Sequence, residues 1–276
     1  VTDNFRMDIN TSYLWNDNKY SDDYTRDFTR STRIPSLNRL YNDDGTPNLG
    51  ESSNPRNRLH QLYYQDFNNN TARWIGRIAL DWEIIKNLHY RPSASLNSTI
   101  TSTMNFEKFY PQQSRPRDKY QRMAKSSQIM TDHILQYDFS IKKHNIMALA
   151  GFNYTINESF WVLGQSQRSA SDYINTITGD PQSTTINGVV SPNMTASSEF
   201  AQTKSASFFV QANYDYDGRY ILGMSLRRDG FSNFAPENRF ATFPSVSAAW
   251  NMHREKFWKE NDILNQLKIR TSWGKT

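Results

Sequence analysis

The stretch Ser205–Trp250 reads SASFFVQANYDYDGRYILGMSLRRDGFSNFAPENRFATFPSVSAAW and contains the clearest strand–turn–strand pattern of the chain. Apolar and polar residues alternate up to Tyr216, Asp217-Gly218-Arg219 follows, and the alternation resumes at Tyr220. Alternation with a period of two on both sides of an Asp-Gly turn predicts a β-hairpin. A three-residue turn also sets the pairs expected to face each other: Tyr216 with Tyr220, Tyr214 with Leu222, Ala212 with Met224, and Val210 with Leu226.

The composition limits the classes of function. The 276 residues carry a net charge of +5 with no block of Lys and Arg, so a nucleic-acid-binding patch is not expected. Cysteine is absent, which excludes a disulfide framework and a Cys-ligated metal site. No apolar run of about 18 residues occurs, which excludes a transmembrane helix, and the first residues do not resemble a signal peptide. Aromatic residues make up 14% although the mean hydropathy is −0.79, so the chain is aromatic but polar.

Alternation of the same kind predicts nine strands, at 5–16, 73–84, 88–97, 129–141, 146–156, 207–216, 220–227, 246–252 and 267–274. The first strand is about twice as long as the ~5–6 residues typical of soluble proteins, and it suits the ~9–11 residues of a tilted membrane-spanning strand. Pro92 predicts a bulge or local break in its strand, because proline cannot donate a main-chain hydrogen bond.

Long and short connections alternate along the chain. The long ones are 17–71, 101–125, 157–203 and 229–242, and the short ones are 85–87, 142–145, 217–219 and 253–266, the last with a short helical turn. In an up-and-down meander all long loops then emerge at one end, as they do in outer-membrane barrels. The predicted fold class is therefore all-β, a segment of an antiparallel up-and-down transmembrane β-barrel. A soluble β-sandwich has similar strands and polar loops, and it is the alternative.

Two groups of side chains are candidates for substrate binding. The first is a charged row on the polar face of the second strand, formed by Arg73, Arg77, Asp81 and Glu83. It is either a polar track for substrate or simply a hydrated wall. The second group consists of aromatic residues in or beside the long loops: Phe109, Tyr110, Phe160, Trp161 and Tyr173. Exposed aromatic side chains can stack on sugars or anchor a protein lid, and packing within the loops is the alternative.

Catalysis has no support in the sequence. The five histidines do not pair at the i, i+2 or i, i+4 spacings that are typical of metal ligands. The ending Gly274-Lys275-Thr276 resembles part of a phosphate-binding loop, but Ile269 stands where that motif needs its first glycine. We therefore expect neither an enzyme nor a metal or other cofactor.

Five short pieces follow one another near the end of the chain: Gly218-Arg219-Tyr220, Arg227-Arg228-Asp229-Gly230, Asn238-Arg239-Phe240, Phe243-Pro244-Ser245-Val246-Ser247-Ala248, and Leu267-Lys268-Ile269-Arg270-Thr271-Ser272-Trp273-Gly274. In order and spacing they resemble the barrel region of SusC/RagA-type TonB-dependent transporters of Bacteroidetes outer membranes. The resemblance is specific over roughly 218–276, looser at 74–76, 84–88 and 145–151, and almost without signal in the long loops.

This resemblance implies a plugged barrel of the 22-stranded class, located in the outer membrane. It also implies import of bulky nutrients such as oligosaccharides or peptides, with TonB as the energy source and a SusD-like surface lipoprotein as a lid. Within residues 1–276 we expect neither the family's plug domain nor its TonB-contacting segment, and nine strands cannot close such a barrel. We therefore expect residues 1–276 to be a partial barrel domain. The alternative function is a soluble or cell-surface β-rich glycan-binding module.

Overall fold

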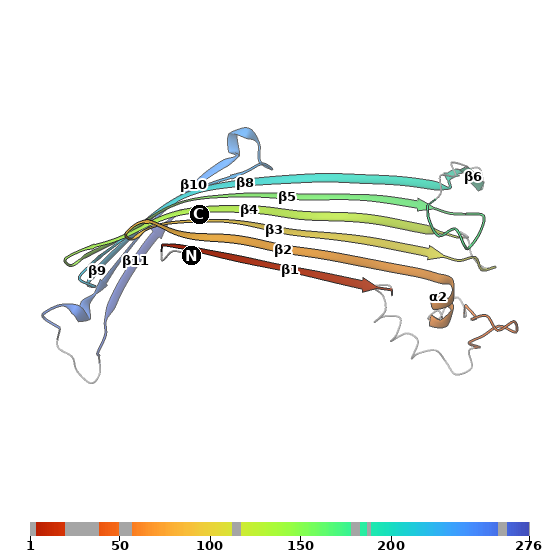
Figure 1. The fold of residues 1–276 in the computed structure, drawn as a ribbon, viewed down its shortest axis with the longest axis horizontal. Coiled ribbons are helices and arrows are strands. Elements are labelled where there is room, and N and C mark those ends of the chain that lie inside the picture. Colours follow the sequence, from red (N-terminus) through yellow and green to blue (C-terminus); the bar gives the residue numbers. More distant parts are fainter. Residues whose placement is uncertain are drawn as a thin grey trace.

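The computed structural model describes residues 4–19, 39–49, 57–111, 117–177, 183–186, 189–258 and 264–275. Nine antiparallel strands form one sheet in the order β1-β2-β3-β4-β5-β8-β9-β10-β11, and a small hairpin, β6–β7, lies apart (Figure 1). The strands of the sheet are β1 Phe5–Asn18, β2 Gln65–Ile85, β3 Leu88–Glu107, β4 Lys119–Ile141, β5 His144–Ser166, β8 Met194–Tyr216, β9 Tyr220–Phe231, β10 Phe240–Asn251 and β11 Lys268–Gly274. The remaining elements are α2 Arg58–Tyr64, η1 Pro236–Asn238, η2 Met252–Arg254, β6 Ser183–Ile186 and β7 Val189–Pro192.

The prediction of an all-β chain with a nine-stranded up-and-down sheet is confirmed. Strands β1, β3 and β5 all end at the same end of the sheet, near α2 and β6 in Figure 1, and the tight turns lie at the other end. No helix in the described ranges is long and apolar enough to cross a membrane.

The hairpin that led the prediction forms with the expected register. Tyr216 pairs with Tyr220, and Val210 pairs with Leu226. Its turn needs two residues with left-handed backbone, Asp217 with φ 54° and Gly218 with φ 64°. Asp and Gly tolerate this conformation better than most residues, which explains the Asp-Gly signal.

The two faces of the sheet differ sharply in polarity. Along each strand one set of alternate residues is apolar and faces what we call the outer face, and the other set is largely polar and faces the inner face. Large apolar side chains of the outer face are open to the surroundings, for example Met224 at 60% and Val210 at 51% exposure. Among the described residues only Phe106 and Tyr110 are buried large hydrophobics, so no second sheet covers this face. Such an extensive apolar surface fits the hydrocarbon of a bilayer and contradicts the β-sandwich.

The apolar band of the outer face moves along the strands from one strand to the next. Trp74 lies in this band on β2, but the register leads from it through Ser98 and Ser127 to Glu158 and then to polar Gln202 on β8. A band that is level with the membrane plane therefore crosses strands that are tilted. Strand tilt of this kind is required to close a sheet into a barrel.

All four predicted long loops are wrong in extent, because the flanking strands continue into 17–71, 101–125, 157–203 and 229–242. β2 begins at Gln65, β3 continues to Glu107, and β8 begins at Met194. Beyond the apolar band neither face is uniformly apolar, so the regular alternation disappears from the sequence. The main-chain ladder continues there because it does not depend on side-chain polarity.

Three details of the tight connections also differ from the predictions. The turns predicted at 85–87 and 142–145 contain only two residues each, with left-handed backbone at Asn87 and Lys142. Leu88 pairs with Ile85 instead of Ile84, because the register shifts between Glu83 and Ile85. The short helical turn expected in 253–266 is η2, which begins one residue earlier.

Pro92 interrupts one ladder without ending its strand. The pairing of β2 with β3 passes from Ala79–Ser93 to Trp82–Tyr90 and leaves out the two intervening pairs, while the register stays the same. On its other side Pro92 stays in register with His133 of β4. The expected local break is therefore confined to one edge, and the bulge lies elsewhere.

A glycine under an aromatic ring generates the first prediction. On the inner face the ring of Phe209 lies over Gly151, its register partner, and a Cβ at Gly151 would overlap that ring. We expect Gly151→Ala to lower the free energy of unfolding by about 1–3 kcal/mol, because the ring must leave its position. Gly76→Ala is the matched control, since its new Cβ would meet nothing closer than 3.7 Å. Urea unfolding of the refolded protein measures both, and equal losses would contradict the packing argument.

The turn end of the sheet carries a cluster of ion pairs. Lys143 Nζ lies 2.8 Å from Asp217 Oδ2, and Arg219 Nη2 lies 3.2 Å from the same oxygen. Beside them, Glu255 accepts hydrogen bonds from Tyr220 Oη at 2.7 Å and Trp250 Nε1 at 3.1 Å. These contacts tie the β8–β9 turn to the β4–β5 turn and to the segment after η2.

This cluster predicts acid sensitivity of the turn. The hydrogen bond from Lys143 holds the pKa of Asp217 below its ordinary value of 3.8. A lowered carboxyl pKa contributes stability that is complete above 3.8 and is lost as the pH falls through the folded-state pKa. We expect amide exchange in 215–219, corrected for its intrinsic pH dependence, to become less protected as the pH falls below about 4. Asp217→Asn should abolish this pH dependence, and a wild-type-like dependence in that variant would assign it to another group.

Candidate functional site on the inner face

Polar side chains of β2, β3 and β4 form a hydrogen-bonded network on the inner face. Asp81 Oδ1 lies 2.8 Å from His89 Nδ1, and Asp81 Oδ2 accepts from Arg91 Nε at 3.0 Å. Arg91 Nη1 donates to Gln136 Oε1 at 2.8 Å, which carries the network to β4. Since the side chains of Asp81 and Arg91 are more than a third exposed, the network is a hydrated wall and not a buried ion pair.

The predicted charged row lies on one face of β2, but its members have separate partners. Arg73 Nε donates to Asn97 Oδ1 at 3.2 Å. Glu83 Oε1 accepts from the main-chain N–H of Asn87 at 2.8 Å and so stabilises the tight turn. Asp81 belongs to the network, and no ion pair of Arg77 is found in the described part of the chain.

A second cluster lies farther from the turns, where three neighbouring strands bring Arg122, Trp161 and Glu199 together. Trp161 pairs directly with Glu199 across β5 and β8, and its Nε1 donates to Glu199 Oε2 at 3.0 Å. The guanidinium carbon of Arg122, from β4, lies 5.4 Å from the centre of the Trp161 ring, which is cation–π geometry. A flat aromatic ring beside one positive and one negative group can bind a polar ligand by stacking and hydrogen bonding.

The segment after β5 is held against the β3–β4 connection. Arg117 Nε donates to Asp172 Oδ1 at 2.7 Å, and the N–H of Phe109 donates to the same oxygen at 3.1 Å. Lys119, only 1% exposed, donates to the carbonyl of Thr176 at 2.8 Å. Between these contacts Tyr173 is 96% exposed, so a fixed segment presents a free aromatic side chain.

The other predicted loop aromatics occupy different settings. Phe160 and Trp161 are not in a loop, because β5 continues to Ser166; Trp161 faces inward and Phe160 outward. Tyr110 is 8% exposed, its ring centre lies 4.7 Å from that of His60, and its hydroxyl donates to Glu107 at 3.0 Å. Its ring and hydroxyl are therefore both used within the protein.

Sequence reasoning missed Arg122 and Glu199, since both were assigned to predicted loops. Arg122 could have been found by continuing the residue pairing of the predicted β4–β5 hairpin past its predicted ends, whereas no local signal pairs Glu199 with Trp161. Extension of the β4–β5 hairpin from its turn places Ala124 opposite Trp161, with Arg122 one step farther on the same face.

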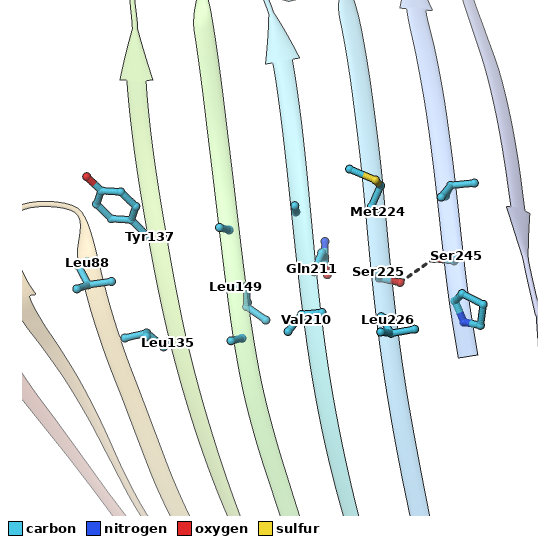
Figure 2. Close-up of a pocket in the computed structure, with 15 residues that line it drawn as sticks. Leu88, Leu135, Tyr137, Leu149, Val210, Gln211, Met224, Ser225, Leu226 and Ser245 are labelled. Atoms are coloured by element: carbon cyan, nitrogen blue, oxygen red, sulfur yellow. Dashed lines mark hydrogen bonds between the residues drawn. The ribbon is translucent and has the colours of Figure 1, made fainter. Parts of the chain in front are cut away.

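A hollow of about 600 Å³ lies on the opposite, outer face. Figure 2 shows it across β3, β4, β5, β8, β9 and β10. It arises because Ala148, Ala150 and Ala212 are small, while Tyr137 and Met224 stand higher on either side. Its lining is almost wholly apolar, which suits a hydrocarbon chain and offers little to a polar solute.

Comparison with known proteins shows which family the chain belongs to. Residues 3–276 match the family model described as TonB dependent receptor-like, beta-barrel. The chain belongs to the TonB-dependent receptor β-barrel family. It is 33% identical over 149 residues to TonB-dependent receptor P3 of Formosa agariphila, covering 53% of this chain and 14% of that protein. It is also 40% identical over 70 residues to TonB-dependent receptor SusC of Bacteroides thetaiotaomicron, covering 25% of this chain and 7% of that one.

Solved structures agree on the fold. The RagAB peptide transporter superposes with a TM-score of 0.76 and 21% identity over 99% of this chain and 31% of that chain. This superposition confirms the barrel-wall fold. The family model and the similarity to the receptor named SusC confirm the resemblance identified in the sequence. The chain spans less than a third of the lengths of these relatives.

The Trp161 cluster yields a prediction about ring access. We expect Arg122→Ala to make Trp161 more accessible to acrylamide, because it uncovers one face of the ring. The Trp161 contribution is the fluorescence that disappears in Trp161→Phe. Arg73→Ala is the control, since Arg73 lies on the same face of the sheet but contacts Asn97 instead. Unchanged quenching in Arg122→Ala would contradict the stacked geometry.

Proposed function

We propose that this chain forms part of the wall of an outer-membrane barrel that imports oligosaccharides or peptides by a TonB-dependent mechanism. The observation that carries the proposal is the contrast between an exposed apolar band on the outer face and a hydrogen-bonded polar inner face in strands of up to 23 residues. Lipid suits only the first face and water only the second. Membership of the TonB-dependent receptor family supports the coupling to TonB.

The proposal includes a SusD-like surface lipoprotein as a partner. Similarity to the receptor named SusC and to the RagAB transporter supports this pairing. Tyr173, exposed on a fixed segment at the end of the sheet away from the tight turns, is the described side chain best placed to meet a lid or an incoming solute.

The proposed solute contacts on the inner face follow the wall from one end to the other. Trp161 is the stacking residue. The charged row on β2, which runs toward the tight turns, supplies polar contacts through Arg73, Arg77, Asp81 and Glu83. Tyr110 acts indirectly in this proposal, by holding the connection beside Phe109. No step of covalent chemistry is involved, since transport needs only binding and release.

The test uses the full-length protein in its native cells. We expect it to fractionate with the outer membrane, to migrate in a heat-modifiable way in gels, and to support uptake of a labelled oligosaccharide or peptide mixture only when TonB is present. Trp161→Ala should reduce uptake about tenfold, as expected for the loss of one stacking contact of roughly 1–1.5 kcal/mol.

Trp161→Phe is the matched variant, because it keeps an aromatic face and should retain most of the uptake. A water-soluble protein that binds glycans without any TonB-dependent uptake would favour the alternative, a soluble or cell-surface glycan-binding module.

A further inference from the structure

β8 extends well beyond the end of its neighbour β9 along the strand direction. All 23 residues of β8 pair with β5, but β9 pairs only with Ser205–Tyr216. At the step, Lys204 is joined to Ser232 by two hydrogen bonds of 2.8 Å, one from Ser232 N to Lys204 O and one from Lys204 N to Ser232 Oγ. Figure 1 shows β8 continuing toward the end that carries β6, well past the end of β9.

Beyond this step one edge of β8 has no main-chain partner in the described structure. Alternate residues of a strand direct their N–H and C=O groups to the same edge. Since Lys204 points toward β9, so do Ala196, Ser198, Phe200 and Gln202. Their N–H and C=O groups therefore lie on an open edge, which we call the β8 edge, 195–203.

The β8 edge contains no proline, lysine or bulge, and Glu199 is its single charged residue. Natural open edges are commonly blunted by Pro, Lys or a bulge, but 195–203 reads TASSEFAQT and its pairing with β5 is regular. Residues 195–202 are all exposed, and Phe200 is 62% exposed. The edge also lies beyond the apolar band of β8, which begins near Ala206, so lipid does not cover it.

We propose that the β8 edge binds an extended peptide by main-chain pairing, so that a peptide adds a strand to the wall beside the Trp161 cluster. An edge of this kind offers donors and acceptors at strand spacing, which a peptide backbone matches and a sugar chain does not. Its nine residues suit a peptide of roughly 7–9 residues at ~3.3 Å each. The inference rests on the proposed transport function and names a peptide as the solute.

The side chains beside the edge define a preference. Glu199 faces inward and accepts one hydrogen bond from Trp161, and a carboxylate has further acceptor capacity. A residue of the peptide on the inner side next to Glu199 is therefore expected to be basic. On the outer side Phe200 favours an apolar residue. A peptide in which lysine and valine alternate meets both conditions.

The test measures binding of a nonapeptide of alternating lysine and valine to the full-length transporter. We expect it to slow amide exchange in 195–203 and to bind, whereas the same peptide N-methylated along one edge does neither. Ser198→Pro should weaken binding about tenfold, because it removes a donor from the open edge and adds a ring there while leaving the β5 ladder intact. Ser198→Ala keeps the main chain and should bind within about twofold of wild type.

A second variant keeps the proposal testable if Ser198→Pro fails to reach the membrane. Glu199→Lys should reverse the preference, so that a peptide of alternating glutamate and valine binds more tightly than the lysine peptide. An unchanged preference for the lysine peptide overturns the proposal.

Other outcomes also decide the matter. The peptide site is overturned if the N-methylated peptide binds equally well, or if the peptide binds without protecting 195–203 from amide exchange. It is also overturned if the surface lipoprotein, and not the peptide, protects 195–203. Uptake of solutes by wild-type cells is measured separately. TonB-dependent uptake without edge protection removes this inference alone, whereas loss of all uptake removes the proposed function.

Discussion

The main chain of this protein has to satisfy its own hydrogen bonds wherever its surroundings are apolar. A bilayer offers no partner to an N–H or C=O group, so each strand depends on its neighbours across the whole apolar band. The ladder lapses near Pro92, between β2 and β3, and the ion pair of Asp81 with Arg91 joins the same two strands at that level on the inner face. A side-chain contact thus links the strands where main-chain pairing is missing.

Because the ladder holds the wall together, side chains on the two faces are free to serve different purposes. Within the apolar band the outer-face side chains vary mainly in size, and this variation produces the shallow hollow around Ala212. The inner face combines large rings, glycines and charges, as in the stacking of Arg227 over Phe209, which itself covers Gly151. The Trp161 cluster follows the same pattern, and it lies beside the β8 edge.

Much of the fold could be predicted where one face of a strand meets lipid, because hydrophobicity then alternates with a period of two. This is why the hairpin from Val210 to Leu226 was predicted pair by pair. The same rule fails beyond the band, where Trp161 and Phe160 were assigned to a loop. The charged row of β2 was placed on the correct face, but the turn contact of Glu83 depends on a register shift that no local pattern signals.

The sequence by itself determined the number of strands in the large sheet, the all-β class, the polarity of each face and the Asp-Gly turn, since these depend on local alternation and on backbone preferences at single residues. It did not predict the small hairpin β6–β7. The tertiary structure alone decided how far each strand extends and which side chains meet across three strands. Those features depend on pairing between distant residues, such as Trp161 with Glu199. Where both faces of the sheet are in water, main-chain pairing does not require a pattern of side-chain polarity, so the sequence does not reveal it. The open edge of β8 belongs to this second group, because it exists only through the difference in length between two paired strands.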